Sequence, residues 1–328
     1  MAIDTVKDAL SDVFDRVAVE GMMTGGFAVR GPWVSQGELS EPFKLIALVA
    51  GAARVRVDGP GGAVGPIELA PGDVVLLNHQ TWLEMRGGSG ETEPVSLAPE
   101  TTFDAVALAT ADLSRDTVLV GGAIGVSPVG TELLRNALPG LVHVAAASSA
   151  WSRSDELVQQ LFDEASGGRL GSDFAIRQHA QLLLLEVLRA YLGQERPAIG
   201  WLRLLADERL APALRRMHAD PGRSWGLAEL ASAAGMSRTA FAERFRSVAG
   251  EPPLTYLGRW RMVLAQQALQ DPDVRVGALA TQLGYGSESA FSNAFKRAVG
   301  EAPLHYRQRA AGSHQRSRRA PSSLSPHA

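Results

Sequence analysis

The sequence predicts an α+β protein of two domains, a β-rich N-terminal domain followed by helices and an all-helical C-terminal domain. Three observations lead to this prediction. Short β-branched runs separated by glycine and proline fill the first part of the chain, and helical periodicity replaces them near Gly130. One helical unit then occurs twice after residue 200. The length of 328 residues also favours two domains over one.

The N-terminal domain is expected to open with a short amphipathic helix over residues 4–16 and to continue as a β-barrel or sandwich over about 22–126. Turn residues recur there at a spacing of roughly ten, which is typical of such folds. Residues 54–58 alternate polar and apolar, as a half-buried strand does. Residues 59–66 (GPGGAVGP) are interpreted as a hairpin loop. The clearest strands are predicted at 44–49, 53–57, 74–77 and 117–120.

Helices are predicted over about residues 131–193, at 131–137, 154–165 and 172–192. The last of them is the strongest, because apolar side chains from Ile176 to Tyr191 recur at steps of three and four residues. Two antiparallel helices meeting at the Gly167-Gly168 turn would leave an apolar stripe. That stripe is buried either against the barrel or against a second subunit, and both alternatives stay open.

The predicted boundaries divide the chain into four parts. Residues 1–195 form the first domain, 196–208 a linker around the Arg196-Pro197 step, and 209–311 the helical domain. The tail at 312–328 is polar and rich in serine, proline and arginine, so we expect it to be disordered.

Composition argues against a membrane protein and against an enzyme. No apolar stretch approaches about 20 residues, and the acidic N-terminus lacks the pattern of a secretory signal, so a cytoplasmic protein is expected. The chain has no cysteine, and neither His79 nor His143 has a partner at metal-chelating spacing. No nucleophile elbow, phosphate-binding loop or dinucleotide fingerprint occurs. We therefore predict no catalytic residue, no metal and no cofactor.

The internal repeat is the most specific feature of the sequence. Residues 236–256 (MSRTAFAERFRSVAGEPPLTY) align with residues 286–306 (GSESAFSNAFKRAVGEAPLHY) at an offset of 50. Aromatic, glycine and proline positions coincide in both copies. Upstream the offset is 49, so the second copy holds one extra residue in its turn.

Each copy predicts a helix, a glycine turn and a second, capped helix. The first helices are expected at 227–234 and 276–283, each ending near a glycine that tolerates a positive φ. Ser237 and Ser287 stand at the N-cap positions of the second helices, 238–249 and 288–299. This is the helix-turn-helix arrangement, whose second helix enters a major groove of DNA. The alternative for a single copy is an ordinary helical hairpin.

A long helix is predicted between the two copies. Pro252 and Pro253 suit its first turn, and residues 254–269 continue it as far as Asp271-Pro272. Sixteen residues span about 24 Å. With the flanking turns, this length suits two recognition helices separated by one DNA turn of about 34–36 Å.

The charge distribution also favours a nucleic-acid partner for the C-terminal half. Residues 1–200 carry 14 basic and 25 acidic side chains, whereas residues 201–328 carry 18 and 10. The net charge of −3 therefore conceals a basic half of +8. A basic half that also holds DNA-reading helices matches the charge pattern of a DNA-binding domain.

The second copy resembles the DNA-binding domain of the AraC/XylS family of transcription regulators, through GYGSESAFSNAFKRAVGEAPLHYR. The resemblance covers about residues 205–309. The front of the chain resembles the cupin-type domain of some family members. The resemblance lies at Gly31-Pro32-Trp33, the strand pair around Val55 and Leu76, Pro71-Gly72-Asp73, and the stretch 197–220 that leads into the DNA-binding half. The resemblance implies a cupin-like sensor with a helical dimerisation segment and a domain with two helix-turn-helix units.

By position, the resemblance also implies which side chains meet DNA. Glu243 and Asn293 depart from the basic residues frequent at their positions, and Glu243 is equally consistent with an ion pair to a neighbouring arginine. Arg261 resembles a family contact to the DNA backbone, or covers the helix surface. The implied base contacts are Arg238, Thr239, Ala242, Glu243, Glu288, Ser289, Ser292 and Asn293. The implied backbone contacts are Ser237, Arg246, Arg261, Ser287, Lys296 and Arg297.

The predicted function is sequence-specific transcription regulation by binding double-stranded DNA. The resemblance implies a homodimer that responds to a small-molecule effector and activates transcription with RNA polymerase. One alternative is a regulator that needs no ligand, in which the cupin-like domain only dimerises. The other is a cupin enzyme with a helical docking module.

Overall fold

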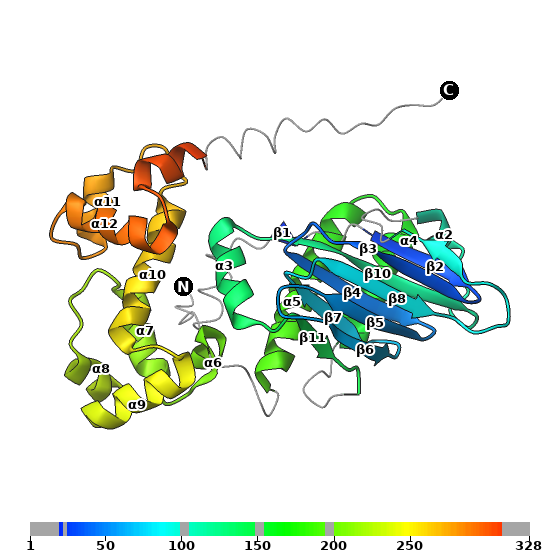
Figure 1. Cartoon of the computed structure of the whole chain (residues 1–328), viewed down its shortest axis with the longest axis horizontal. Helices are drawn as coiled ribbons and strands as arrows, with labels where there is room; N and C mark the ends of the chain where they lie inside the picture. The colour runs from blue at the N-terminus through cyan, green and yellow to red at the C-terminus, as the bar shows by residue number, and fades with distance from the viewer. Residues whose placement is uncertain (1–19, 22–24, 99–104, 148–153, 194–199, 310–328) are drawn as a thin grey trace, which may run out of the picture. The chain divides into compact units, whose positions relative to one another are not determined.

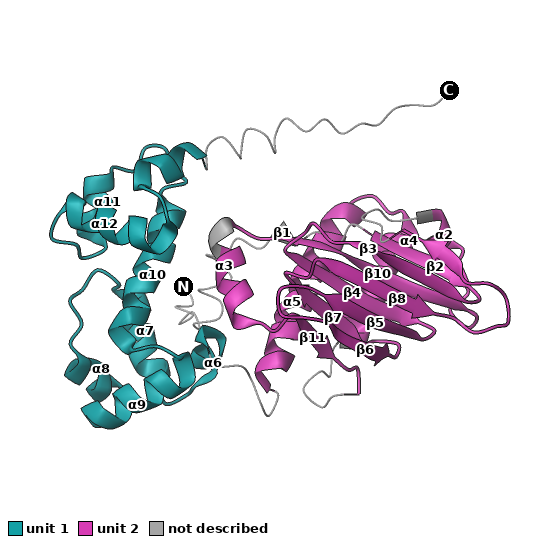
Figure 2. Ribbon diagram, viewed as in Figure 1, with its two compact units in different colours: residues 1–16, 199–328 teal, residues 17–198 magenta. Residues whose placement is uncertain are grey.

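The structure is a computed structural model that describes residues 20–21, 25–98, 105–147, 154–193 and 200–309 (Figure 1). The predicted helix at 4–16 and the predicted tail at 312–328 lie outside the described residues. The chain divides into two compact units (Figure 2). Their described parts are residues 20–193, here called the strand-rich unit, and residues 200–309, here called the helical unit.

The strand-rich unit contains two sheets. Apart from the parallel pair of β3 and β9, the paired strands run antiparallel. In the first sheet the order is β1 (Glu20–Gly21), β10 (Asp116–Gly125), β4 (Phe43–Ala50), β7 (Val74–Asn78) and β11 (Leu141–Val144), and β2 (Gly25–Arg30) also pairs with β10. In the second sheet the order is β6 (Val64–Leu69), β5 (Ala53–Asp58), β8 (Trp82–Gly87), β3 (Trp33–Glu38) and β9 (Val95–Leu97).

The two sheets pack face to face around one core. Side chains at alternate positions of each strand enter it, as in β5, where Val55 and Val57 are fully buried and Arg54 and Arg56 are exposed. Each such burial of a valine contributes about 1.5–3 kcal/mol. The first sheet supplies residues such as Leu48 to the same core. The predicted β-rich N-terminal domain is thus confirmed. β5 and β6 form the predicted hairpin, but its loop is shorter than the expected 59–66, because residues 64–66 already belong to β6.

The helices of the strand-rich unit are α2 (Ala105–Ala109), α3 (Pro128–Ala137), α4 (Ser154–Gly167) and α5 (Ser172–Gly193). Helix α5 contacts α4, β1 and β11, so its apolar stripe is covered within the chain. Two elements differ from the prediction. Residues 141–144 (LVHV) form β11 inside the region expected to be helical, because this β-branched run pairs with the edge of β7. Helix α2 has five residues, too few for a visible period.

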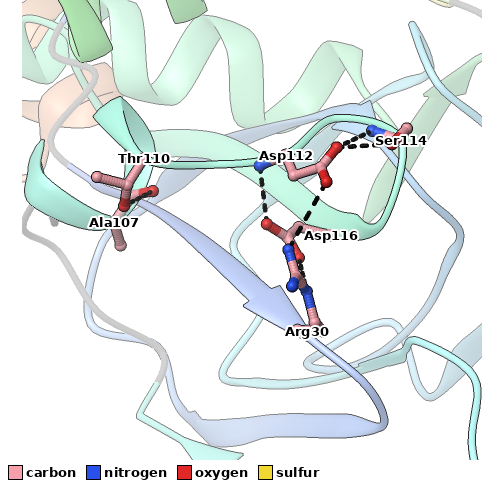
Figure 3. Close-up of polar contacts among 6 residues, drawn as sticks. All are labelled: Arg30, Ala107, Thr110, Asp112, Ser114 and Asp116. Carbon is pink, nitrogen blue, oxygen red and sulfur yellow. Dashed lines mark hydrogen bonds and ion pairs between the residues drawn. The ribbon is translucent and has the colours of Figure 1, made fainter.

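One end of the first sheet is braced by charged groups (Figure 3). The Arg30 Nε donates to Asp116 Oδ1 at 2.7 Å, and the backbone N–H of Asp112 donates to Asp116 Oδ2 at 2.8 Å. Asp112 in turn accepts from the Ser114 hydroxyl at 2.6 Å. These hydrogen bonds lower the pKa of Asp116, chiefly through Arg30, and the pKa of Asp112, chiefly through Ser114.

The Asp116 carboxylate is expected to stabilise the fold at neutral pH but not in acid. Asp116→Asn should therefore be less stable than wild type at neutral pH, and closer to it at low pH. A lowered folded-state pKa gives stability that is present above the unfolded value of 3.8 and is lost as pH falls through the lower folded value. The Tm difference between wild type and Asp116→Asn should therefore shrink from neutral pH to about pH 3. Thermal unfolding over this range measures it, with the exposed Glu91→Gln as control. A constant difference would contradict the assignment.

The helical unit contains seven helices with assigned bounds, and residues 303–309 are also helical. Helix α6 occupies part of the expected linker at 196–208, because Trp201, Leu202 and Leu204 are buried and hold this segment on the unit. The seven are α6 (Trp201–Ala206), α7 (Ala211–Ala219), α8 (Leu227–Ala233), α9 (Arg238–Ala249), α10 (Pro253–Ala268), α11 (Val276–Gln282) and α12 (Glu288–Val299).

Candidate nucleic-acid interface

The first helix-turn-helix unit consists of α8 and α9. Gly235 in the turn has a φ of 62°, a conformation that favours glycine. The Ser237 hydroxyl accepts the Ala240 N–H at 3.2 Å and caps α9. Phe241 and Phe245 are fully buried, with ring centroids 5.7 Å apart, so this face of α9 is fixed in the core and the opposite face is free.

The second unit, α11 and α12, repeats these features. Gly284 has a φ of 78°, and the Ser287 hydroxyl accepts the Ala290 N–H at 3.1 Å. Phe291 and Phe295 are fully buried, with ring centroids 5.8 Å apart. The predicted pair of helix-turn-helix units is confirmed, and the predicted bounds of the two second helices match α9 and α12.

The two caps lead to a prediction about stability. Ser237→Ala and Ser287→Ala should each lower the free energy of unfolding by about 1 kcal/mol, because the replaced hydroxyl leaves a backbone N–H of the first turn without its acceptor. Urea unfolding at one temperature measures this loss. Ser237→Asp and Ser287→Asp, which keep an acceptor, are the controls and should stay near wild type. Equal loss in alanine and aspartate variants would contradict the capping role.

The free face of each second helix carries the base-contact candidates. In α9, Arg238, Thr239 and Glu243 are exposed and Ala242 is partly exposed. In α12 the corresponding residues are the exposed Glu288, Ser289 and Asn293 and the partly exposed Ser292. The structure therefore brings the eight candidates together as two sets of four, one on each helix.

The polar partners of these candidates differ. Glu243 and Asn293 make no side-chain hydrogen bond or ion pair with a described residue, so the ion pair considered for Glu243 is not found there. Ser289 Oγ lies 3.0 Å from Ser287 Oγ. The carboxylate of Glu288 lies over α11, since a Cβ added to Gly277 would come within 2.8 Å of its Oε2.

The backbone-contact candidates of the two helices are exposed cations in the last turn. Arg246 in α9, and Lys296 and Arg297 in α12, form no ion pair with the described part of the chain. Their charges are therefore not neutralised by a neighbouring carboxylate. An anionic ligand with regularly spaced charges, such as a phosphate backbone, meets unpaired cations at both helices.

Helix α9 has a brace that α12 lacks and that sequence reasoning missed. Arg244 Nη2 lies 2.8 Å from Asp207 Oδ2 in the turn between α6 and α7. The same carboxylate accepts the N–H of Leu210 at 3.1 Å. In the second copy the position of Arg244 is Ala294. The two copies differ at many other positions as well, so this difference gave no specific signal for a contact outside the repeat.

The long helix α10 joins the two helix-turn-helix units and packs on α7. His218 of α7 stacks on Trp260, with ring centroids 4.1 Å apart, and its Nε2 lies 2.8 Å from the Tyr256 hydroxyl. Pro253 stands in the first turn of α10, as predicted from the proline pair. These contacts hold α10 against the helix that precedes the first unit.

Arg261 of α10 lies between the loop that precedes the first helix-turn-helix unit and the turn of the second unit. Its Nε donates to the Pro221 carbonyl at 2.6 Å and its Nη2 to the Arg223 carbonyl at 3.0 Å, both in the loop between α7 and α8. The guanidinium lies 5.9 Å from the ring centre of Tyr285 in the turn of the second unit. At the same place a Cβ on Gly284 would come within 2.0 Å of the Gly222 carbonyl oxygen, so the turn of the second unit is in direct backbone contact with the loop between α7 and α8.

Among the described residues, no group of three or more His, Asp or Glu side chains is placed to hold a metal ion. None of the described helices is long and apolar enough to cross a membrane.

Comparisons with known proteins agree with this arrangement. Residues 8–193 match the cupin family, and residues 230–309 match the helix-turn-helix domain family. A protein of Streptomyces lividans named an AraC-like transcription regulator is 33% identical over 92% of this chain and 98% of its own. The RCS-specific HTH-type transcriptional activator RclR of Escherichia coli (strain K12) is 29% identical over 92% and 98%. The solved DNA-binding domain of AdpA in complex with a target DNA is 32% identical, covers 34% of this chain and 97% of that domain, and has a TM-score of 0.30.

Proposed function

Because the chain belongs to the family of AraC-like transcription regulators and is a DNA-binding regulator of that kind, we propose that it reads two successive major grooves with α9 and α12. The observation that supports this most is the duplicated unit, in which α9 and α12 each have one face buried by a pair of phenylalanines and the opposite face exposed. Helix α10, with 16 residues, spans about 24 Å between the units. With the turns that flank α10, this length suits two recognition helices separated by one DNA turn of about 34–36 Å.

The proposed base contacts are the two sets of four candidates. Asn293 suits adenine, to which its amide both donates and accepts, and Glu243 suits the amino group of cytosine. Arg246, Lys296 and Arg297 are proposed to bind phosphates, which fix the register without selecting a sequence. Ser237 uses its oxygen as a cap acceptor, and its O–H remains a donor for a phosphate. Ser287 has the same cap and is assigned the same contact.

Arg261 is assigned a positioning role in place of a DNA backbone contact. Two of its nitrogen atoms already donate to the Pro221 and Arg223 carbonyls, and the side chain is partly covered by Tyr285. We propose that it fixes the loop before the first helix-turn-helix unit against the turn of the second, and so the orientation of the one helix-turn-helix unit relative to the other. Because each helix must meet its own groove, that orientation decides whether both grooves are read by one chain.

The strand-rich unit is proposed to bind a small-molecule effector and to form a homodimer. Effector binding would change the population of the DNA-binding conformation, since a ligand shifts an equilibrium by its difference in affinity for the two states. We propose that the protein acts in the cytoplasm and activates transcription by contact with RNA polymerase. No cofactor is assigned.

Footprinting of the purified full chain on the DNA upstream of its own gene tests the proposed function. We expect one or more discrete protected sites, each covering at least one helical turn of DNA. Uniform weak protection along the fragment, with or without added small molecules, would contradict sequence-specific binding.

A further inference from the structure

Helix α9 is attached to the first described segment of the helical unit, residues 200–207, here called the α6 segment. The Gly200 N–H donates to the Val248 carbonyl at 3.1 Å. This carbonyl belongs to the last turn of α9, where a helix leaves its carbonyls without partners of its own. Helix α6 itself packs on α9. At the other end of the segment, Asp207 pairs with Arg244 in the middle of α9. The α6 segment therefore holds α9 at its middle and at its C-terminal end.

The ion pair of Arg244 with Asp207 has two points of contact. Nε lies 3.3 Å from Oδ1, and Nη2 lies 2.8 Å from Oδ2. The Asp207 side chain is only 7% exposed, and its Oδ1 also accepts the N–H groups of Arg209 and Leu210, each at 3.1 Å. A two-point contact of guanidinium and carboxylate fixes direction as well as distance. Arg244 is thus joined to a carboxylate that the start of α7 holds in place.

Helix α12 is held differently. Ala294 stands at the position of Arg244, so α12 cannot form this ion pair. Among the helices with assigned bounds, α12 packs on α10 and α11. The C-terminal ends also differ, since Val248 and Ala249 of α9 are buried, whereas residues 298–299 of α12 are exposed and partly exposed. The α6 segment is therefore a support of one recognition helix and not of the other.

The position of α9 matters for all of its base-contact candidates together. Arg244 follows Glu243 directly in the helix, and Thr239 and Ala242 lie on the preceding turn. A hydrogen bond to a base needs its donor and acceptor within about 2.7–3.2 Å. A small rotation or shift of α9 would therefore weaken every contact that this helix makes, although none of the contacting side chains is altered.

We propose that Arg244 and Asp207 are positioning residues, which hold α9 in the orientation that its groove requires while α12 reads its own groove without them. The inference rests on the proposed reading of two grooves and names residues that support one half of it. Neither residue is assigned a contact with DNA, because Asp207 neutralises the guanidinium and occupies its two donors. The two halves of the operator thus depend on different parts of the helical unit.

Two variants of the full chain break the ion pair from either side. Arg244→Ala removes the guanidinium, and Asp207→Asn removes the charge but keeps an oxygen for the N–H groups at the start of α7. Each should lower discrimination against base changes in the α9 half of the operator by about fivefold or more, and leave it unchanged in the α12 half. The double variant should lose no more than either single one, because both act through one contact. Arg244→Lys, which keeps the charge without the two-point contact, should lose less than Arg244→Ala.

The direction of the Asp207→Asn effect separates positioning from a phosphate contact. If Arg244 bound a phosphate, its release from Asp207 would strengthen binding to every sequence and increase the salt dependence. Positioning predicts a loss of discrimination confined to the α9 half, as in Arg244→Ala. Stronger binding to all operators with both halves still discriminated would overturn the proposal. An equal loss in both halves, which general destabilisation would cause, would overturn it as well.

Glu208→Gln and Arg209→Ala are the matched controls. Both side chains are exposed, adjoin Asp207 in the chain and make no hydrogen bond or ion pair with a described residue. They change the net charge by the same amounts as Asp207→Asn and Arg244→Ala. Overall affinity should follow the charge, and discrimination should stay as in wild type in both halves. A loss in the α9 half as large as that of the matched variant would assign the effect to charge and overturn the positioning role.

Amide hydrogen exchange of the DNA-free protein tests the same contact without an operator. Exchange in α9 should be faster in both variants, and exchange in α12 should stay as in wild type. Unchanged exchange in α9 would overturn the proposed attachment. Two operator halves with unaltered discrimination in both variants would overturn the positioning role and leave the proposed function intact. If wild type reads only one groove, the proposed function is contradicted, whereas faster exchange confined to α9 would still support the attachment.

Discussion

Phe295→Ala is expected to lower the free energy of unfolding of the helical unit by about 3–5 kcal/mol. Phe295 is fully buried in the core of the second helix-turn-helix unit. Its ring centroid lies 5.8 Å from that of Phe291 and 5.6 Å from that of Tyr306. Removal of the ring leaves a cavity between α12 and the helical segment at 303–309, which relaxes only in part.

Urea unfolding followed by tryptophan fluorescence measures this loss, since Trp225 and Trp260 lie in the helical unit. Phe295→Leu, which leaves a smaller cavity, is the graded control and should lose less. Lys296→Ala is an exposed control one residue away and should stay within about 0.5 kcal/mol of wild type. A loss below about 1 kcal/mol for Phe295→Ala would mean that this ring does not hold α12 in place.

Asn293→Ala is expected to reduce discrimination at one base pair by about 1–3 kcal/mol, which is roughly 5- to 150-fold in relative affinity. Asn293 is exposed in the middle of α12 and makes no hydrogen bond with a described side chain, so its amide is available to a base. Lys296 has a different expected role. Lys296→Ala should weaken all sequences alike and lower the salt dependence of binding by about one phosphate contact.

These two variants are measured on one set of operator fragments that carry each of the four bases at every position of the site. Affinity is then measured at several salt concentrations. Wild type and Lys296→Ala should rank the fragments in the same order, whereas Asn293→Ala should lose its preference at one position. Loss of base preference in Lys296→Ala would contradict its assignment as a phosphate contact. An altered salt dependence in Asn293→Ala would contradict its assignment as a base contact.

Much of the helical unit was predictable because the same physical requirements occur twice. A glycine with positive φ, a serine cap and a pair of buried aromatic rings are each recognisable in the sequence, and the repeat shows that they belong together. The predicted limits of α9 and α12 agree with the structure for this reason. The strands were predicted from alternation, as in β5, where buried valines alternate with exposed arginines.

The features that sequence reasoning missed depend on residues far apart in the chain. The Arg244–Asp207 ion pair spans 37 residues and the Arg261–Pro221 hydrogen bond spans 40. In both pairs, the sequence around each residue does not indicate which distant residue it contacts. Strand β11 was missed because its four residues stand between two helical patterns, beyond the region expected to form strands.

The most direct test of one chain reading two grooves is chemical interference on a bound operator. Guanines methylated at N7 and thymines replaced by uracil alter only the major groove, so they report contacts there. We predict two clusters of interfering positions about 10–10.5 base pairs apart on one face of the DNA. Asn293→Ala should change only one cluster, and Glu243→Ala only the other. A single cluster, or two clusters that both variants change alike, would contradict the account.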